Sequence, residues 1–449
     1  MNDDDISLSS NPSVSMVGLG SPIRTLLENP DVTLLKYRDE IGSLPLPEDD
    51  YDHHTFLRNV RIRKSQKTEM YSQLIDELVN DSNKRARGPN QLAVFRYHWE
   101  CVVCCLSQAF FMRRWLVVSL DKERYGDSGN FWIKKCGFTY RCTKDIVDYL
   151  RKSGLVSIKP GKVFKDQPSG TRMYPSGLLV EKIWAYFLYT EEEMEPPYVC
   201  INEPHGRWGE VINILANDHP DVADMILINE YLKSSHWVCK APIRLVYKYD
   251  ILHGGRLITP FQSLPDRSVR LRINTLLDGL PICEVDYNAN HLRLNLAALN
   301  HQHAGDTPYE DIMDIAGLDT ESPQARLIVK QYITKSMGAA DEHEARGAFI
   351  KSKGANFKLF EQIKEATYKR YPKIVLFKGW GTNAQSLEGE ILRKVMVEGV
   401  NLGIASLPVH DALAVNHQHA DWAQEAMARV WADVVGGVGT KLKVDYPTS

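Results

Sequence analysis

Two aspartates stand where an apolar strand gives way to a turn. Asp286 is the second-last residue of the apolar segment 282–287 (ICEVDY). Asp411 lies in segment 403–415 (GIASLPVHDALAV), where His410-Asp411 separates two apolar runs. The second segment is typical of a β-hairpin with an acid at its tip. A carboxylate at the end of a buried strand is costly unless it is paired, hydrogen-bonded or bound to a metal. The two acids therefore predict one shared site for hard cations, although each alone could be a structural turn residue.

A strongly basic segment lies between the two acids. Residues 326–378 hold twelve Lys or Arg and five Asp or Glu, in a chain whose formal net charge is −3. Arg326 and Lys330 are four residues apart and so lie on one face of the helix expected there. Such a pair could grip a triphosphate, whereas the ordinary role of two basic residues is a solvated helix face. Their position between the two acids favours the triphosphate.

The composition is that of a globular protein. The 449 residues, 43% hydrophobic and 25% charged, predict two or three domains and exclude collagen and wholesale disorder. Because 54 Lys and Arg nearly balance 57 Asp and Glu, bulk charge does not predict a protein that coats nucleic acid, while a local basic cleft remains open. The sequence has no run of eighteen apolar residues, and it starts with an acidic, polar stretch. We therefore expect a soluble, cytoplasmic protein with no membrane partner.

Three of the eight cysteines, Cys101, Cys104 and Cys105, lie close together in the sequence. Their spacing contains a CxxC pair, which is found in zinc sites. The surrounding sequence, AVFRYHWECVVCCLSQAFF, is instead typical of a buried helix, and no second CxxC or HxxxH pair accompanies it. Free thiols are common in protein cores. We expect a helix with reduced cysteines and keep a structural zinc as the alternative.

Residues 94–184 show the order helix, strand, turn, strand. Thr143 is the expected N-cap of a helix that Gly154 ends, and Pro160-Gly161 marks a turn between the two strands. This order is typical of a winged helix, a module that binds DNA. Seven basic residues would form its DNA-binding face: Arg141, Lys144, Arg151, Lys152, Lys159, Lys162 and Arg172. The alternative is a small α+β packing module with an ordinary charged surface.

Five segments between residues 252 and 415 together resemble the right-hand polymerases, specifically family A DNA polymerases of the phage and plasmid type that lack an exonuclease. In chain order they are GGRLI with Arg256, EVDYNANH with Asp286, RLIVK with Lys330 and a following MG, NAQSLEG with Gln385, and VHD with Asp411. One such motif would be weak evidence, whereas five in the order of the family are specific.

The resemblance implies an α+β fold. It is that of a right-hand polymerase with an antiparallel-sheet palm and helical fingers and thumb, preceded by a mainly helical N-terminal module with the winged helix. The boundaries would be a disordered tail at 1–25, a helical segment with a basic linker at 26–93, the winged-helix module at 94–200, thumb-like helices at 201–255, the first part of the palm at 256–300, the fingers at 301–384 and the second part of the palm at 385–449.

The resemblance also assigns site residues. The implied metal ligands, for two Mg²⁺ ions or Mn²⁺ in their place, are the carboxylates of Asp286 and Asp411 and the carbonyl of Tyr287. The implied nucleotide-binding residues are Arg326, Lys330 and His291. The implied primer-template contacts are Arg256, Gln385 and His410.

Departures from the family pattern concern nucleotide selection more than catalysis. Ala412 follows His-Asp where glutamate is frequent, and Thr334 and Met337 occupy aromatic positions of the fingers helix. His291 stands where the family usually has a glutamate that excludes the ribose 2′-hydroxyl. Histidine is large enough to crowd that hydroxyl, so we expect deoxynucleotides to be preferred, with weaker discrimination than a glutamate gives.

Together these features predict a template-directed nucleotidyltransferase. We expect a DNA polymerase or primase-polymerase of a phage or mobile element, a monomer in the cytoplasm of a bacterial host, which acts on a DNA primer-template with dNTPs, or NTPs. Two alternatives stay open. One is an NTP-using primase or single-subunit RNA polymerase, and the other is a non-catalytic replication initiator whose palm serves as a scaffold.

Overall fold

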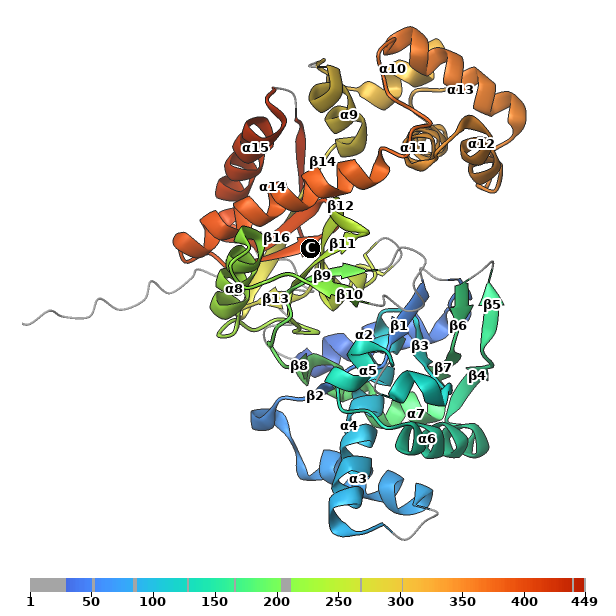
Figure 1. Ribbon diagram of the computed structural model, residues 1–449, viewed down its shortest axis with the longest axis vertical. Helices are drawn as coiled ribbons and strands as arrows, with labels where there is room; N and C mark the ends of the chain where they lie inside the picture. Colours follow the sequence, from blue (N-terminus) through green and yellow to red (C-terminus); the bar gives the residue numbers. More distant parts are fainter. Residues whose placement is uncertain are drawn as a thin grey trace, which may run out of the picture.

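The computed structural model describes residues 30–50, 53–83, 87–126, 129–164, 167–202, 211–266, 269–300, 302–437 and 440–447. The tail expected at 1–25 lies outside these residues. Helices and mostly antiparallel strands are both abundant, as the α+β prediction requires. An N-terminal module lies at one end of the molecule, and a group of helices from the C-terminal half lies at the other (Figure 1). Within the described residues, no helix is long and apolar enough to cross a membrane.

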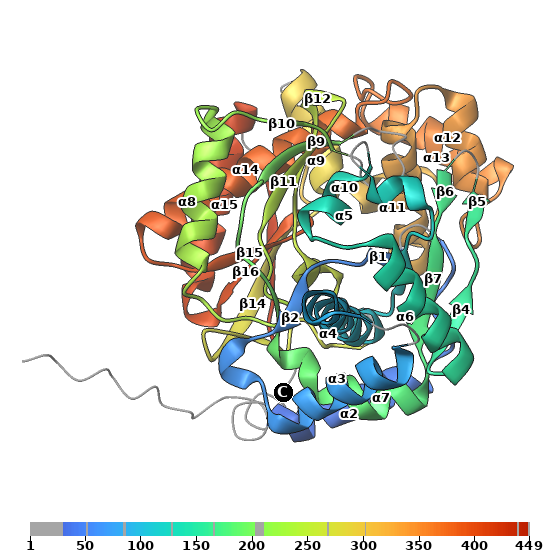
Figure 2. The same cartoon turned by 60° about the horizontal axis from the view of Figure 1, so that its bottom comes forward.

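A long buried helix, α4 (Pro89–Phe111), organises the N-terminal module. Its residues from Trp99 to Phe111 are all buried, because α3 (Glu69–Ser82), α6 (Tyr140–Ser153) and α7 (Gly177–Ile183) pack around it. Figure 2 looks nearly along its axis. The remaining elements before α4 are α2 (Pro30–Ser43), β1 (His54–Phe56), β2 (Val60–Ile62) and the 3-10 helix η2 (Lys64–Gln66).

The three neighbouring cysteines of α4 are buried thiols. Cys101 packs against Cys136 and Phe138, Cys104 contacts the hydroxyl of Tyr71 at 3.6 Å, and Cys105 donates a hydrogen bond to a backbone carbonyl. Burial raises the pKa of each thiol, which keeps it protonated and disfavours the thiolate form that zinc requires. The helix expected from the apolar sequence is present, and its thiols serve packing.

The elements that follow α4 have the order expected of a winged helix. They are β3 (Trp115–Val118), η3 (Lys122–Tyr125), α5 (Phe131–Lys135), α6, β4 (Val156–Lys159), the hairpin of β5 (Lys162–Phe164) and β6 (Gln167–Ser169), and β7 (Thr171–Pro175). The sheet order is β1-β3-β7-β4. Gly154 ends α6 in the left-handed conformation, as expected. The expected N-cap was wrong, because Thr139 caps the helix and Thr143 lies inside it.

The basic face expected on this module is smaller than the sequence indicated. Arg172 is buried, because β7 is an inner strand of the sheet, and it forms an ion pair with Asp49 at 2.8 Å. Lys159 also contacts Asp49, at 3.3 Å, and lies over the ring of Trp115. The side chain of Lys162 lies outside the described part of the structure. DNA binding by this module stays a prediction.

The stretch 201–255, expected to be thumb-like helices, contains only one helix among its described residues. That helix is α8 (Pro220–Leu232). The strands β9 (Val199–Asn202), β10 (Val211–Ile214), β11 (Arg244–Lys248) and β12 (Asp250–Ile258) form a sheet of order β10-β9-β11-β12, hereafter the middle sheet. Outside α8 the expectation of helix was wrong. In β11, for example, exposed or half-buried residues alternate with buried Leu245 and Tyr247, which is the pattern of a strand. Whether this region acts as a thumb stays a prediction.

The C-terminal half contains the expected antiparallel sheet, hereafter the C-terminal sheet. Its strands are β13 (Leu276–Leu277), β14 (Leu280–Tyr287), β15 (Ser406–Val409), β16 (Ala412–Asn416) and β17 (Leu442–Asp445), and all their pairings are antiparallel. The helices α14 (Gly381–Asn401) and α15 (Ala420–Val435) share its apolar core. Outside the helical insertion, the remaining elements of the described residues are the short helices η4 (Trp184–Tyr189), η5 (Pro260–Ser263) and η6 (His417–His419) and strand β8 (Thr190–Glu192).

The basic segment between the two aspartates is helical, as expected. After α9 (Asn290–Asn300) come α10 (Pro308–Ile315), α11 (Pro323–Gly338), α12 (Glu342–Ile350) and α13 (Phe357–Arg370). These helices have a core of their own, in which Tyr332, Phe349 and Phe360 contact one another. The basic side chains can therefore stay at the surface while the apolar face of each helix is buried.

Candidate active site

A cavity of about 160 Å³ lies where the C-terminal sheet, the helical insertion and β12 meet. It collects residues that are far apart in the sequence. They are Arg256, Asp286, Tyr287, Ala289, Asn290, His291, Tyr309, Lys330, Thr334, Glu388 and Asp411. Six of the nine residues that the sequence singled out are in this set, namely Arg256, Asp286, Tyr287, His291, Lys330 and Asp411.

Strand pairing brings the two aspartates together. Asp286 on β14 pairs with Ala412 on β16, and Asp411 directly precedes Ala412. The turn between β15 and β16 is the two-residue segment His410-Asp411, as the sequence predicted, and His410 has a φ of 57°. Both aspartates were expected to be buried, which was wrong. Asp286 is exposed and Asp411 is half-buried, because the strand ends face the cavity and not the core.

The surroundings of the two carboxylates disfavour their ionised forms. Partial burial raises the pKa of Asp411 to about 7, and the carboxylates of Glu388 and Asp286 add to the effect. The pKa of Asp286 is also raised, chiefly by loss of solvation, although the ammonium groups of Lys330 and Lys443 act in the opposite direction. A cation that coordinated both carboxylates would supply the missing positive charge.

Tyr287 contributes its backbone and not its ring to this site. Its side chain is buried, and its hydroxyl donates a hydrogen bond to the carbonyl of Met427 on α15 at 2.8 Å. The residue still lines the cavity. The role implied for it, a carbonyl ligand beside Asp286, is compatible with this placement.

Glu388 is a site residue that the sequence analysis missed. Its carboxylate is 3% exposed and accepts hydrogen bonds from the side-chain amide of Asn290 (3.0 Å) and from Nε2 of His291 (2.8 Å). The indole of Trp431 in turn donates to Asn290 at 3.2 Å. Loss of solvation lowers the pKa of His291, but the carboxylate of Glu388 outweighs it, so the pKa is raised overall. A charged pair of this kind fixes the imidazole at the wall of the cavity.

Close packing of two glycines places Glu388. A Cβ built at Gly389 on α14 would lie 1.7 Å from the carbonyl oxygen of Gly255 on β12, so only glycine fits there. The contact brings α14 directly onto β12, and the guanidinium of Arg256 lies 3.8 Å from the carboxylate of Glu388. The NAQSLEG and GGRLI segments are therefore one packed unit. The available sequence signal for Glu388 was its position three residues after Gln385 on the same helix.

The two basic residues of α11 have different surroundings. Lys330 is exposed and lines the cavity with Thr334, one turn further along the same face. Arg326 does not line the cavity: it forms an ion pair with Glu310 at 2.6 Å and lies over the ring of Tyr309. The sequence predicted that both would bind a triphosphate, and the structure brings only Lys330 to the aspartates.

Gln385 and His410 lie at the margin of the site. Gln385 is on α14, one turn before Glu388, and its side-chain oxygen is buried with no hydrogen-bond partner among the described residues. His410 is exposed at the tip of the hairpin, where its backbone N–H donates to the side-chain oxygen of Gln262 at 3.3 Å. Neither residue lines the cavity itself.

The donor set suits a hard divalent cation. Two carboxylates, both with a raised pKa, and a backbone carbonyl are oxygen donors of the kind that Mg²⁺ or Mn²⁺ prefers. A different group of potential ligands, Glu48, Asp50 and His53, gathers on the surface of the N-terminal module. It is an exposed acidic cluster without further features of a site.

Comparison with family models and with curated protein sequences finds no match. Among solved structures, the chain is similar to the POL domain of Pol1 from M. smegmatis, solved in complex with a DNA primer-template and dNTP. The two are 11% identical, the TM-score is 0.33, and the match covers 95% of this chain and 70% of that chain. At this level the likeness is loose, and the functional case rests on the cavity.

Proposed function

We propose that the protein is a template-directed nucleotidyltransferase that extends the 3′-hydroxyl of a DNA primer with deoxynucleoside triphosphates. The observation that supports this most is the meeting of Asp286, Asp411 and Lys330 at one cavity. Mg²⁺ is usually held by one or two carboxylates together with substrate phosphates, and a lysine can neutralise the charge of those phosphates.

Phosphoryl transfer needs positioning and charge neutralisation more than covalent chemistry from the protein. Asp286, Asp411 and the Tyr287 carbonyl would hold two Mg²⁺ ions, or Mn²⁺, which supply charge neutralisation at the attacking and leaving oxygens. Lys330 would attract and orient the triphosphate from the opposite wall. His291, held by Glu388, would lie against the sugar of the incoming nucleotide.

The primer-template would lie beyond the cavity, against Arg256, Gln385 and His410. Arg256 is partly exposed beside Glu388, which leaves its guanidinium accessible to a phosphate. The buried side-chain oxygen of Gln385 has no partner among the described residues and could accept a hydrogen bond if the helix end opened to the primer-template. In this proposal the C-terminal sheet is the palm, the helices α10–α13 are the fingers, and the enzyme is a monomeric polymerase or primase-polymerase of the phage and plasmid type of family A.

Primer extension with labelled dNTPs tests the proposal. The wild type should extend a primed DNA template in Mg²⁺, and Asp286→Asn should abolish extension because it removes one ligand charge. Asp314→Asn, the same substitution at an exposed acid of α10, should behave like the wild type. If Asp286→Asn keeps activity within about tenfold of the wild type, a barrier change of only ~1.4 kcal/mol, the assignment is wrong.

A further inference from the structure

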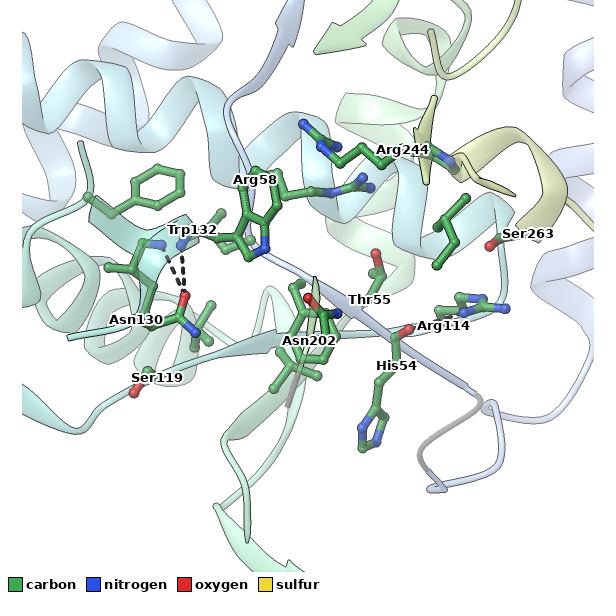
Figure 3. A pocket seen from close by; sticks show the side chains of 18 of the residues that line it. His54, Thr55, Arg58, Arg114, Ser119, Asn130, Trp132, Asn202, Arg244 and Ser263 are labelled. Carbon is green, nitrogen blue, oxygen red and sulfur yellow. Dashed lines mark hydrogen bonds between the residues drawn. The ribbon is translucent and has the colours of Figure 1, made fainter. Parts of the chain in front are cut away.

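A second cavity, of about 340 Å³, lies between the N-terminal module and the middle sheet (Figure 3). Its size is that of a small-molecule pocket. Its walls come from β1, β3, α5, β9, β11 and η5, so it exists only because the two parts of the molecule pack together. It shares no residue with the cavity that holds Asp286 and Asp411.

The charge of this pocket is positive. Three arginines line it, Arg58, Arg114 and Arg244, and no Asp or Glu is among its described lining residues. The buried carboxylate of Glu192 pairs with both Arg58 (3.3 Å) and Arg244 (2.6 Å), so one negative charge serves two guanidinium groups. The surplus positive charge favours an anionic ligand.

The other walls are aromatic and apolar. Phe56, Tyr125, Trp132 and Phe138 line the pocket, and the guanidinium of Arg244 lies 4.6 Å from the centre of the Trp132 ring. In Figure 3, Trp132 lies next to Arg58 and Arg244. An aromatic wall beside arginines suits a ligand that has a flat ring and an anionic group.

Buried polar atoms of the pocket residues Asn130 and Thr259 lack a hydrogen-bond partner in the described structure. The side-chain amide nitrogen of Asn130 and the hydroxyl of Thr259 make no hydrogen bond, and these residues are 7% and 1% exposed. The oxygen of Asn130 is already used, since it accepts from two backbone N–H groups at the start of α5 (Figure 3). Leaving buried polar groups unpaired is costly, which indicates that a ligand pairs with them.

The pocket is next to the candidate active site. The short helix η5 contributes Pro260 and Ser263 to the pocket wall, and its Gln262 accepts the hydrogen bond from the backbone of His410. One turn of 3-10 helix thus separates this pocket from the hairpin that carries Asp411.

We propose that the pocket binds a nucleotide unit, with its base against the aromatic wall and its phosphate on the arginines. The general chemistry, a flat ring with an anion, follows from the pocket, and its identification as a nucleotide rests on the proposed function. The unit is either a free mononucleotide or the 5′-phosphorylated end of a strand. In either case this is a second nucleotide site, distinct from the triphosphate at Lys330.

Calorimetric titration of the full chain with AMP in EDTA tests the proposal. The Lys330→Ala background weakens nucleotide binding at the other site. AMP should bind, and adenosine, which lacks the phosphate, should bind at least tenfold more weakly. Asn130→Asp keeps the cap of α5 but replaces the amide donor with a carboxylate, and it should weaken AMP binding at least tenfold. Thr259→Val, which removes an unpartnered hydroxyl without changing the shape, should weaken it severalfold.

The matched control is Asn356→Asp, the same change at the N-cap of α13, which should leave AMP binding unchanged. A 5′-phosphorylated oligonucleotide separates the two sources. If the oligonucleotide binds more tightly than AMP and this binding is lost in Asn130→Asp, the pocket binds a strand end. If AMP binds more tightly than the oligonucleotide, the pocket binds a free nucleotide. The proposal is overturned if folded protein binds no AMP at millimolar concentration. It is also overturned if Asn130→Asp and Thr259→Val leave the affinity for AMP unchanged.

This test is independent of the proposed function. If AMP binds in the pocket while the wild type extends no primer, the polymerase assignment fails and the pocket stands. If extension depends on Asp286 while AMP does not bind, only the pocket assignment fails.

Discussion

The imidazole Nε2 of His291 lies 2.8 Å from a carboxylate oxygen of Glu388, although the two residues are on different helices and almost a hundred positions apart. Asn290, the neighbour of His291, donates to the same carboxylate, so Glu388 joins the start of α9 to the middle of α14. Polymerases of the family that the sequence resembles carry a glutamate at the position of His291. In this protein the histidine is bonded to Glu388, a glutamate from another helix. The side chain at the wall of the cavity is held in one orientation by this pair.

His291→Ala should raise ribonucleotide incorporation relative to deoxynucleotide incorporation, because it removes the ring expected to crowd the 2′-hydroxyl. Glu388→Gln should shift the ratio in the same direction but less, because the ring stays and loses its fixed orientation. Single-nucleotide extension with dNTP and NTP measures the ratio. His343→Ala, on an exposed face of α12, is the control. A wild type that already prefers NTPs would favour the RNA-synthesising alternative.

Asp411→Asn should abolish incorporation and yet stabilise the metal-free protein. Burial, then Glu388 and Asp286, raise the pKa of Asp411 to about 7, so its ionised form is unfavourable in the folded state at neutral pH. Removing this charge should increase the free energy of unfolding by about 1–2 kcal/mol in EDTA. Urea unfolding measures it, with Asp314→Asn as the control. A lower stability of Asp411→Asn would show that the carboxylate is structural.

Lys330→Ala should raise the KM for nucleotide at least tenfold and leave template affinity unchanged, because the expected partner of the lysine is the triphosphate. Arg326→Ala should have a smaller effect, because Arg326 is paired with Glu310 outside the cavity. Steady-state extension at varied dNTP, together with a DNA-binding titration, separates the two effects. Equal losses in both variants would mean that α11 moves to present Arg326 to the nucleotide.

The charge reversals Arg141→Glu and Lys152→Glu together should weaken DNA binding by the full chain and flatten its salt dependence, if α6 faces DNA. Both side chains are exposed on α6. Lys159, another basic residue of the expected face, is a poorer probe because it contacts Asp49. Lys64→Glu with Lys182→Glu makes the same change of charge elsewhere on the N-terminal module and is the control. If both pairs of substitutions give the same salt dependence of DNA binding, α6 does not face DNA and the module serves packing.

His98 should make the N-terminal module sensitive to acid. The ring is fully buried, its Nδ1 bonds to the carbonyl of Val94, and its Nε2 accepts from the backbone N–H of Thr139, the cap of α6. Burial lowers the pKa of His98 to about 4, against 6.5 for an ordinary histidine. Protonation would remove the acceptor at Nε2.

Because the folded pKa is the lower one, this stability is complete above pH 6.5 and is lost as the pH falls towards 4. Between pH 7.5 and pH 5 the loss should be about 2 kcal/mol. Urea unfolding of the wild type and of His98→Gln, which cannot titrate, should therefore show the steeper decline in the wild type. Parallel curves would mean that the ring does not stay neutral in the folded state.

The sequence by itself determined the local features of the site. Asp286 and Asp411 could be proposed from the sequence because each follows an apolar run in a strand. The spacing of apolar residues and the residue types at a turn are local properties of the chain. The helices of the insertion and the end of α6 at Gly154 follow from the same kind of pattern. These elements can be predicted without knowing which segments pack against them.

Tertiary structure decided which side chains meet. Glu388 enters the site only because Gly389 lets α14 rest on Gly255, and the sequence does not say which helix approaches which strand. Arg326 lies on the same helix as Lys330 and has similar sequence surroundings, but its guanidinium forms an ion pair with Glu310. The strands at 201–255 are stabilised by long-range pairing in the middle sheet, and the arginine-lined pocket needs β1, α5 and β9 together. Contacts between distant segments carry no local signal, because their free energy depends on burial and pairing that only the folded chain provides.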